Sequence, residues 1–437
     1  MKTPALLLLP SALLLFACPP PPGACATTGT GSIAVTFAGL PAGTDGTVTL
    51  MGPTSQTLTM GQTVMVGAGT WAVSGGLVTV SDPLVRTVYA ARASAPNFCL
   101  VKDATQAVTV TWTKVATSNR LWVGNSSGGM GSTHAFDSAS LATTATVTSS
   151  WNANLAASGS TAFDKEGNLW ALGNTTVDPL IARFPAEGFA TPAAPMADRR
   201  IEVAGVNCFP RASALAFDKN GNLFVGSSCK REVYKLPAAS LDGSSTVTPS
   251  LTLTGFMAVS GLAFDKDGNL WVSDSSTEEL LRYDFGSLDG ASATATRRVK
   301  ARKSDQPADP SALKPDALAF DKDGNLWSYD FGLNLVFAVP AAELPGTGPR
   351  SATPLVRISL PVSAVLEGLA FDEGGGLWLP YSAGNLARLA PAQLTVSTGS
   401  GAPTVPDTII TGSSLGSPQG PAFYPAAKGT PLFHALP

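Results

Sequence analysis

A short pattern that returns about every fifty residues constrains this fold more than any other feature of the sequence. The clearest copy, Gly261–Asp274, reads GLAFDKDGNLWVSD. Its phenylalanine recurs with spacings of 54, 47, 56, 51 and 52 residues, at Phe163, Phe217, Phe264, Phe320, Phe371 and, in a degenerate copy, Phe423. A period of this length is typical of a β-propeller, in which each repeat forms one four-stranded blade.

Each repeat predicts four β-strands. In the clearest copy the alternating run Leu262–Asp265 forms the first strand, and Leu270–Val272 forms the second. Between them, Asp265–Asn269 supplies the Gly and Asn residues that a tight hairpin requires. Leu281–Asp284 fits a third strand, and a run such as Ser250–Thr254 of the preceding repeat fits a fourth.

The two ends of the repeat region predict how the ring closes. Arg120–Val123 looks like a second strand without a first strand before it, and Gly420–Tyr424 looks like a first strand without a blade after it. If these two segments pair, residues 118–437 form six blades, and the C-terminal strand closes the ring without open edges. Pro431–Phe433 resembles a further second strand, which leaves a seven-bladed alternative open.

A separate β module precedes the repeats. Residues 31–115 alternate apolar and polar side chains in six to eight short runs, such as Ile33–Phe37 and Val108–Trp112, separated by Gly- and Pro-containing turns. This predicts a small β-sandwich, and the stretch resembles the immunoglobulin-like or prealbumin-like modules near the N-termini of bacterial surface proteins. The whole chain is therefore expected to be all-β. We expect the module to act as a spacer, with a binding role as the alternative.

The N-terminus carries a targeting signal. Residues 1–17 combine Lys2 with a short apolar stretch, as a signal peptide does. The sequence Leu15–Cys18 resembles the lipobox of bacterial lipoproteins, in which the cysteine becomes lipid-modified. Pro19–Pro22 then begins a Pro-rich tether over residues 18–30. We expect a chain anchored to a membrane of the bacterial cell envelope through Cys18, either periplasmic or surface-exposed.

The cysteines fit an exported protein. There are five, and lipidation of Cys18 leaves four that can form two disulfides in an oxidising compartment. Cys25 and Cys99 flank or lie in the N-terminal module, whereas Cys208 and Cys229 belong to one repeat. Pairing within each unit is the simplest expectation.

The repeats resemble those of NHL-repeat and gluconolactonase-like propellers, and the virginiamycin B lyase group has a similar blade. The resemblance covers about residues 118–437 and implies a six-bladed propeller. It does not specify the function, because such propellers include lactonases, a lyase and binding scaffolds. The two histidines, His134 and His434, lie in no motif that resembles the lyase site.

Six positions should meet at one mouth of the central channel, because each lies four residues before a recurring phenylalanine. They are Gly159, Ser213, Ser260, Asp316, Glu367 and Gln419. In gluconolactonase-like propellers such strand starts supply Glu, Asn and Asp ligands to a divalent metal. The resemblance therefore assigns Glu367 to the Glu ligand and Asp316 to the Asp ligand and acid/base. Ser213 and Ser260 stand where the family has Asn, and hydroxyls are weaker calcium ligands.

Two other patterns have structural explanations. The Asp-x-Asp-Gly-Asn turns lack the twelve-residue loop and terminal Glu of a calcium-binding EF-hand, so we interpret them as hairpin turns. The basic clusters Arg199–Arg200 and Arg297–Lys303 fall on or after outer strands, where charge protects a sheet edge. A patch for acidic polysaccharide is the alternative.

The composition narrows the choice of partner. Charged residues make up 14% of the chain and the net charge is −3, which argues against nucleic acid. The leading hypothesis is a lipid-anchored envelope scaffold that binds a protein or glycan partner at its channel mouth without a cofactor. The alternative is a calcium-dependent, lactonase-like hydrolase with Asp316 and Glu367 as catalytic residues. A surface protein without a discrete ligand is a third possibility.

Overall fold

The computed structural model describes most of residues 25–430. The ranges outside the description are 26–27, 83–84, 119, 128–129, 155–157, 174–179, 191–195, 207–213, 244–245, 305, 307–310, 362–367, 382–383, 399–401, 425 and 428–429, together with 1–24 and 431–437. The chain separates into two compact units, one of residues 1–80 and 87–115 and one of residues 81–86 and 116–437. Among the described residues no helix is both long and apolar enough to span a membrane.

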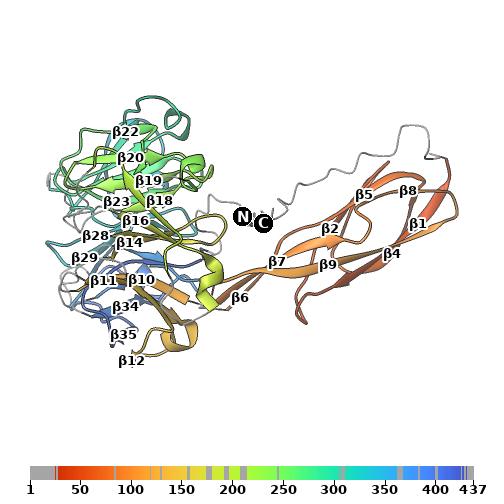
Figure 1. The fold of residues 1–437 in the computed structure, drawn as a ribbon, viewed down its shortest axis with the longest axis horizontal. Helices are drawn as coiled ribbons and strands as arrows, with labels where there is room; N and C mark the ends of the chain where they lie inside the picture. The colour runs from red at the N-terminus through yellow and green to blue at the C-terminus, as the bar shows by residue number, and fades with distance from the viewer. Residues whose placement is uncertain are drawn as a thin grey trace, which may run out of the picture. The chain divides into compact units, whose positions relative to one another are not determined.

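The first unit contains two sheets around one apolar core (Figure 1, red to orange). The sheets have the strand orders β4-β1-β9-β7-β6 and β3-β2-β5-β8. Their bounds are β1 Thr30–Ala38, β2 Val48–Met51, β3 Ser55–Leu58, β4 Gln62–Gly67, β5 Gly69–Gly75, β6 Val78–Asp82, β7 Val85–Ala93, β8 Asn97–Leu100 and β9 Thr105–Ser118. The inward residues alternate along the strands, as Ile33 and Val35 do in β1. A disulfide joins Cys25 to Cys99, which confirms that predicted pair.

The described part of the second unit contains six sheets with four antiparallel strands each, numbered I to VI here (Figure 1, yellow to blue). Sheet I has β36 (Pro418–Ala422), β10 (Arg120–Ser127), β11 (Met130–Asp137) and β13 (Trp151–Asn154), and sheet II has β14 (Ser158–Phe163), β15 (Leu169–Gly173), β16 (Leu180–Phe184) and β17 (Arg199–Val203). Sheet III has β18 (Leu215–Phe217), β19 (Leu223–Ser227), β20 (Glu232–Leu236) and β22 (Leu251–Leu253), and sheet IV has β23 (Val259–Phe264), β24 (Leu270–Asp274), β25 (Glu279–Tyr283) and β26 (Arg297–Ala301). Sheet V has β27 (Ala319–Phe320), β28 (Leu326–Asp330), β29 (Leu335–Val339) and β31 (Val356–Ser359), and sheet VI has β32 (Ala370–Phe371), β33 (Leu377–Pro380), β34 (Asn385–Leu389) and β35 (Thr408–Gly412).

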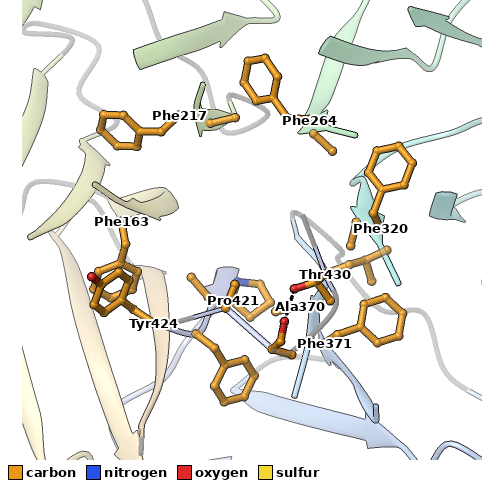
Figure 2. A pocket seen from close by; sticks show the side chains of 17 residues that line it. Phe163, Phe217, Phe264, Phe320, Ala370, Phe371, Pro421, Tyr424 and Thr430 are labelled. Carbon is orange, nitrogen blue, oxygen red and sulfur yellow. Dashed lines mark hydrogen bonds between the residues drawn. The ribbon is translucent and has the colours of Figure 1, made fainter. Parts of the chain in front are cut away.

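The first strand of each sheet carries the recurring phenylalanine or its equivalent, and these residues surround a common centre (Figure 2). Sheet I joins the two ends of the repeat region, because β36 pairs antiparallel with β10. Trp122 lies opposite Ala422 and Gly124 opposite Gln419. This pairing is the one that ring closure by the C-terminal strand requires. Pro431–Phe433, the proposed extra strand, lies outside the described residues.

The six sheets are linked in pairs by short parallel strands that the sequence pattern did not reveal. The segment between the third and fourth strands of one sheet adds a fifth strand to the outer edge of the sheet before it. These strands are β21 (Thr246–Val247) on β17, β30 (Gly348–Ala352) on β26, and β12 (Ala145–Val147) on β35. They join sheets II and III, IV and V, and VI and I. Every second outer edge is thereby covered.

This pairing corrects the interpretation of the basic cluster Arg297–Lys303. Its strand, β26, is not an edge, because β30 pairs with it over five residues. The Arg297 side chain is buried and donates hydrogen bonds to the carbonyls of Thr347 (3.1 Å) and Glu343 (3.0 Å), while Arg298 pairs with Glu279 at 2.7 Å. Two of these arginines therefore hold the structure together.

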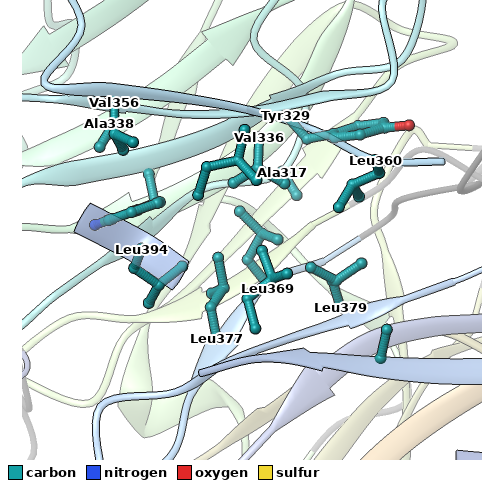
Figure 3. Close-up of a cluster of buried hydrophobic side chains, with 14 of the residues drawn as sticks. Ala317, Tyr329, Val336, Ala338, Val356, Leu360, Leu369, Leu377, Leu379 and Leu394 are labelled. Atoms are coloured by element: carbon teal, nitrogen blue, oxygen red, sulfur yellow. The ribbon is translucent and has the colours of Figure 1, made fainter. Parts of the chain in front are cut away.

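Large side chains fill the spaces between neighbouring sheets. Between sheets V and VI, Tyr329 and Val336 pack with Leu377 and Leu379, and all four are buried (Figure 3). Burial of side chains of this size stabilises a fold by roughly 1.5–3 kcal/mol each. The tryptophans of the second strands, Trp170, Trp271, Trp327 and Trp378, lie in such clusters, so they pack between sheets as the sequence predicted.

The Asp-x-Asp-Gly-Asn turns are hairpin turns with a repeated network of hydrogen bonds. In sheet V, Asp321 Oδ1 accepts the N–H groups of Asp323 and Asn325, at 2.9 Å each. Its Oδ2 accepts Asn325 Nδ2 at 2.9 Å and the indole N–H of Trp327 at 2.8 Å. The same acceptor pattern surrounds Asp164 and Asp265.

The asparagine extends this network to the next turn of the sheet. Its Oδ1 atom accepts a hydrogen bond from the backbone N–H of the first residue of the 3-10 helix that follows the third strand. In sheet V, Asn325 Oδ1 accepts the Ala341 N–H at 2.9 Å. The 3-10 helices are η1 Ser138–Leu141, η2 Ala186–Ala190, η3 Ala238–Ser240, η4 Phe285–Ser287, η5 Ala341–Glu343 and η6 Gln393–Thr395. Sheet VI differs, because Gly376 replaces the asparagine and Arg388 occupies the space beside Asp372.

We predict that Asp321→Ala lowers the free energy of unfolding by about 3 kcal/mol, because the buried indole N–H of Trp327 and two turn amides lose their acceptor. Asp323→Ala is the control. Its carboxylate is exposed and pairs only with Lys322, so its removal should cost less than about 1 kcal/mol. Urea unfolding followed by tryptophan fluorescence measures both, and equal losses would contradict the assigned role of Asp321.

Candidate functional site

The first strands of the sheets line a channel with two neighbouring cavities. One has a volume of about 100 Å³ and is lined by Ser160, Thr161 and Ser260 together with Leu and Gly residues at the strand starts. The other has a volume of about 250 Å³ and lies at the phenylalanine end. Leu369 and Pro421 line both cavities, so they follow one another along the strands.

The phenylalanine end is mainly apolar, with a smaller polar share that includes Thr430. The residue before each phenylalanine is an alanine whose half-buried side chain lines the cavity in five sheets, Ala216, Ala263, Ala319, Ala370 and Ala422. Figure 2 shows the phenylalanine rings around the open centre.

Four of the six predicted mouth positions are described, and they form two neighbouring pairs. The Ser260 side chain lies near the Asp316 carboxyl group, between sheets IV and V, and its Oγ atom is 3.1 Å from Ser275 Oγ. Gly159 lies beside Gln419, because a side chain built on Gly159 would come within 3.7 Å of Gln419 Oε1. Ser213 and Glu367 lie outside the described residues.

Asp316 is held tightly by its surroundings. Its backbone N–H donates to the Tyr329 carbonyl at 3.0 Å, and its carbonyl accepts the Ser273 hydroxyl. A side chain on Gly261 would lie 2.6 Å from this carbonyl, which explains the glycine there. Burial and, to a lesser extent, nearby Asp330 raise the pKa of Asp316 to about 6, whereas the Ser260 hydroxyl acts to lower it. A carboxyl group with this pKa beside a cavity is a candidate functional group.

Gln419 has an unusual environment. Its side chain is 1% exposed, and no residue in the described part of the chain donates a hydrogen bond to its Oε1 atom. A buried amide oxygen without a donor is unfavourable by roughly 1–3 kcal/mol, so this oxygen is suited to accept a hydrogen bond from a molecule inside the protein.

The described residues bring together part of the predicted metal set. Asp316 and Ser260 lie near each other, but no group of three or more His, Cys, Asp or Glu side chains in the described ranges could hold a metal. The turn aspartates are also occupied, since Asp321 accepts four N–H donors.

Three buried polar side chains at the ends of second strands anchor the mouth loops, and the sequence analysis did not identify them as such. Asp274 accepts the N–H groups of Met257 and Ala258, at 2.7 and 3.0 Å. Asp330 accepts Lys314 N–H at 2.8 Å. Asn125 accepts the N–H groups of residues 416 and 417. The sequence did contain a signal for this role, because each of the three residues lies four positions after the leucine at the start of the second-strand motif.

These anchored loops expose apolar side chains. Met257 precedes the first strand of sheet IV and is 51% exposed. Phe331 and Leu333 follow the second strand of sheet V and are 55% and 40% exposed. Large apolar side chains displayed on fixed loops are typical of a surface that contacts a partner.

The structure also shows the surroundings of one histidine and the state of one cysteine from the repeat region. His134 is buried in β11, where its Nε2 contacts Ser132 Oγ at 2.6 Å and its Nδ1 contacts Ser149 Oγ at 3.1 Å. Burial lowers the pKa of His134 to about 4, so the ring is neutral at physiological pH. Cys229 is disulfide-bonded, and its expected partner Cys208 lies outside the described residues. His434 lies outside them as well.

We predict that Asp316→Asn raises the free energy of unfolding at about pH 7.5 by about 2 kcal/mol. Because the folded-state pKa is about 6, above the ordinary 3.8, the folded protein keeps this proton to higher pH, and stability falls as pH rises between these values. The asparagine side chain carries no charge at any of these pH values, so the variant does not lose stability in this way. Urea unfolding at about pH 4 should show no difference from the unsubstituted protein; an equal gain at both pH values would contradict the electrostatic cause.

Comparison with known proteins agrees with this fold. The family model described as SMP-30/Gluconolactonase/LRE-like region matches residues 207–340. No curated protein matches the sequence.

Solved structures similar to this chain are NHL- or YVTN-type β-propellers. A nidogen/laminin complex is 14% identical, with a TM-score of 0.45, and the match covers 72% of this chain and all of that chain. Virginiamycin B lyase from Staphylococcus aureus, an inactive form with quinupristin, is 12% identical, with a TM-score of 0.39 and coverages of 63% and 82%. A streptogramin B lyase structure is 14% identical, with a TM-score of 0.35; the match covers 54% of this chain and 66%, slightly under two thirds, of that one. Residues 207–340 therefore resemble the gluconolactonase-like family, and the described part of the chain is all-β.

Proposed function

We propose that this chain is a lipid-anchored protein of the bacterial cell envelope that binds a partner at its channel mouth. In this proposal sheets I to VI are the blades of a six-bladed β-propeller, closed by β36. The first unit is an immunoglobulin-like or prealbumin-like sandwich that acts as a spacer, and Cys18 carries the lipid. The β36–β10 pairing and the presence of six four-stranded sheets support the closed ring.

The observation that carries the binding role is the exposed apolar side chains on anchored loops. Phe331 directly follows Asp330, whose buried carboxylate holds the N–H groups of Lys314 and Leu333. Met257 is held in the same way by Asp274. Rigid loops lose little conformational entropy on binding, so the exposed apolar area contributes directly to affinity. This chemistry favours a protein partner, and a glycan is the second candidate.

The hydrolase alternative is not part of the proposal. It rests on Asp316 acting together with Glu367, and the structure describes only the first of these.

We predict that Phe331→Ser/Leu333→Ser weakens partner binding at least tenfold, because about 1.4 kcal/mol of lost apolar contact corresponds to that factor. The partner would first be identified by cross-linking in intact cells and then measured with purified components, beside a glycan array. Met196→Ser is the control, because Met196 is 82% exposed but lies between a third and a fourth strand, away from the mouth. Unchanged affinity of the double variant would place the binding surface elsewhere.

We predict that Cys18→Ala moves the protein from the membrane fraction to the soluble fraction and abolishes incorporation of labelled palmitate. Two anchoring chains on one cysteine hold a protein at a membrane, whereas the remaining Pro-rich tether offers no comparable apolar surface. Cys229→Ala should leave the membrane association unchanged. Persistence of Cys18→Ala in salt-washed membranes would contradict the lipid anchor.

A further inference from the structure

We propose that the central channel binds the alkyl chain of a small amphiphile whose head group donates hydrogen bonds. Two neighbouring cavities share the lining residues Leu369 and Pro421; the one at the strand starts is mainly polar, and the one at the phenylalanine end is mainly apolar. The inference rests on the proposed binding role and adds to it a ligand class and a second, internal site.

The polarity gradient follows from the register of the repeat. Ser160, Thr161 and Ser260 line the cavity at the strand starts, and the alanine and phenylalanine of each repeat line the other. Because the repeats set the same residue types at the same height in neighbouring strands, the gradient runs along the channel instead of across it. A molecule with one polar and one apolar end matches this arrangement in one orientation.

The alanines leave the space that an alkyl chain would occupy. Five alanines line the cavity at the phenylalanine end, and each is only partly buried. This cavity has a volume of about 250 Å³ and a mainly apolar lining. An alkyl chain in the cavity would cover that apolar lining, which favours its binding.

The charges at the polar end select the head group. Among the described residues, neither cavity is lined by lysine or arginine. Asp316 directly precedes the lining residue Ala317, and the Asp330 carboxylate is nearby, where it accepts the Lys314 N–H at 2.8 Å. Gln419 directly precedes Gly420 of the cavity wall and adds an amide oxygen to which no described residue donates. This end is rich in acceptors, which favours an alcohol or ammonium head and disfavours a carboxylate.

The test uses the full chain with Cys18→Ser, which prevents lipidation, and the apolar fluorophore N-phenylnaphthylamine as the probe. We expect the probe to bind, and we expect decanol and decylamine to displace it. Decanoate, which has the same chain and an anionic head, should compete at least tenfold more weakly. Displacement by decanol alone would identify a hydroxyl head, and displacement by decylamine alone an ammonium head; both support the proposal.

Ala263→Leu/Ala319→Leu fills the channel without changing its polar end and should reduce alkyl binding at least tenfold. Ala291→Leu, at an exposed alanine, is the matched control. Should the double variant fail to fold by circular dichroism, Ala216→Leu provides the same test. Absence of probe binding, equal competition by decanoate, or unchanged binding by the channel variants would overturn the proposal.

The two proposals fail separately. Phe331→Ser/Leu333→Ser alters the mouth loops and should leave displacement by decanol or decylamine unchanged. Retained partner binding without alkyl binding removes only the channel ligand, and retained alkyl binding without a partner removes only the mouth interface.

Discussion

The turn aspartate is the interaction on which the second unit depends most. One carboxylate accepts the amides that form the hairpin and the indole that packs between sheets, as Asp321 does for Trp327. The neighbouring asparagine then fixes the start of the next 3-10 helix. Strand pairing, inter-sheet packing and turn position are therefore set by a few side chains, and repetition of the aspartate and asparagine gives sheets II to V the same hairpin turn.

Deviations from the repeat show what the network requires. In sheet III, Phe224 replaces the tryptophan and Asp218 keeps its bonds to the turn. In sheet VI the asparagine is lost, and Arg388 supplies donors to Asp372 in its place. A side chain on Gly376 would lie 2.4 Å from that guanidinium. The glycine therefore leaves the room in which Arg388 replaces the missing asparagine. A buried carboxylate is retained in both cases because its donors are retained.

The periodic part of the fold could be predicted, and the non-periodic part could not. The spacing of the phenylalanines located the first and second strands, and the unmatched ends predicted the β36–β10 pair. The parallel strands β12, β21 and β30 were missed because they are two to five residues long and lack alternation. The sequence did contain an indirect signal for the added strands, because an arginine occupies the third strand of every second sheet: Arg183, Arg282 and Arg388. Arg183 and Arg282 donate hydrogen bonds to the segments that lead into the added strands β21 and β30.

The same distinction between periodic and non-periodic features applies to the candidate site. Counting back from the phenylalanine found Asp316 and Ser260, which lie near each other, because height along the channel is a periodic property. It did not reveal the anchoring roles of Asn125, Asp274 and Asp330. These residues share one position in the second strand, but the loops that they hold differ in length between sheets. The repeat therefore builds a channel of uniform wall and graded polarity, while the loops shape its mouth. Selectivity for a particular partner has to come from those loops, because the channel wall offers nearly the same chemistry in every direction.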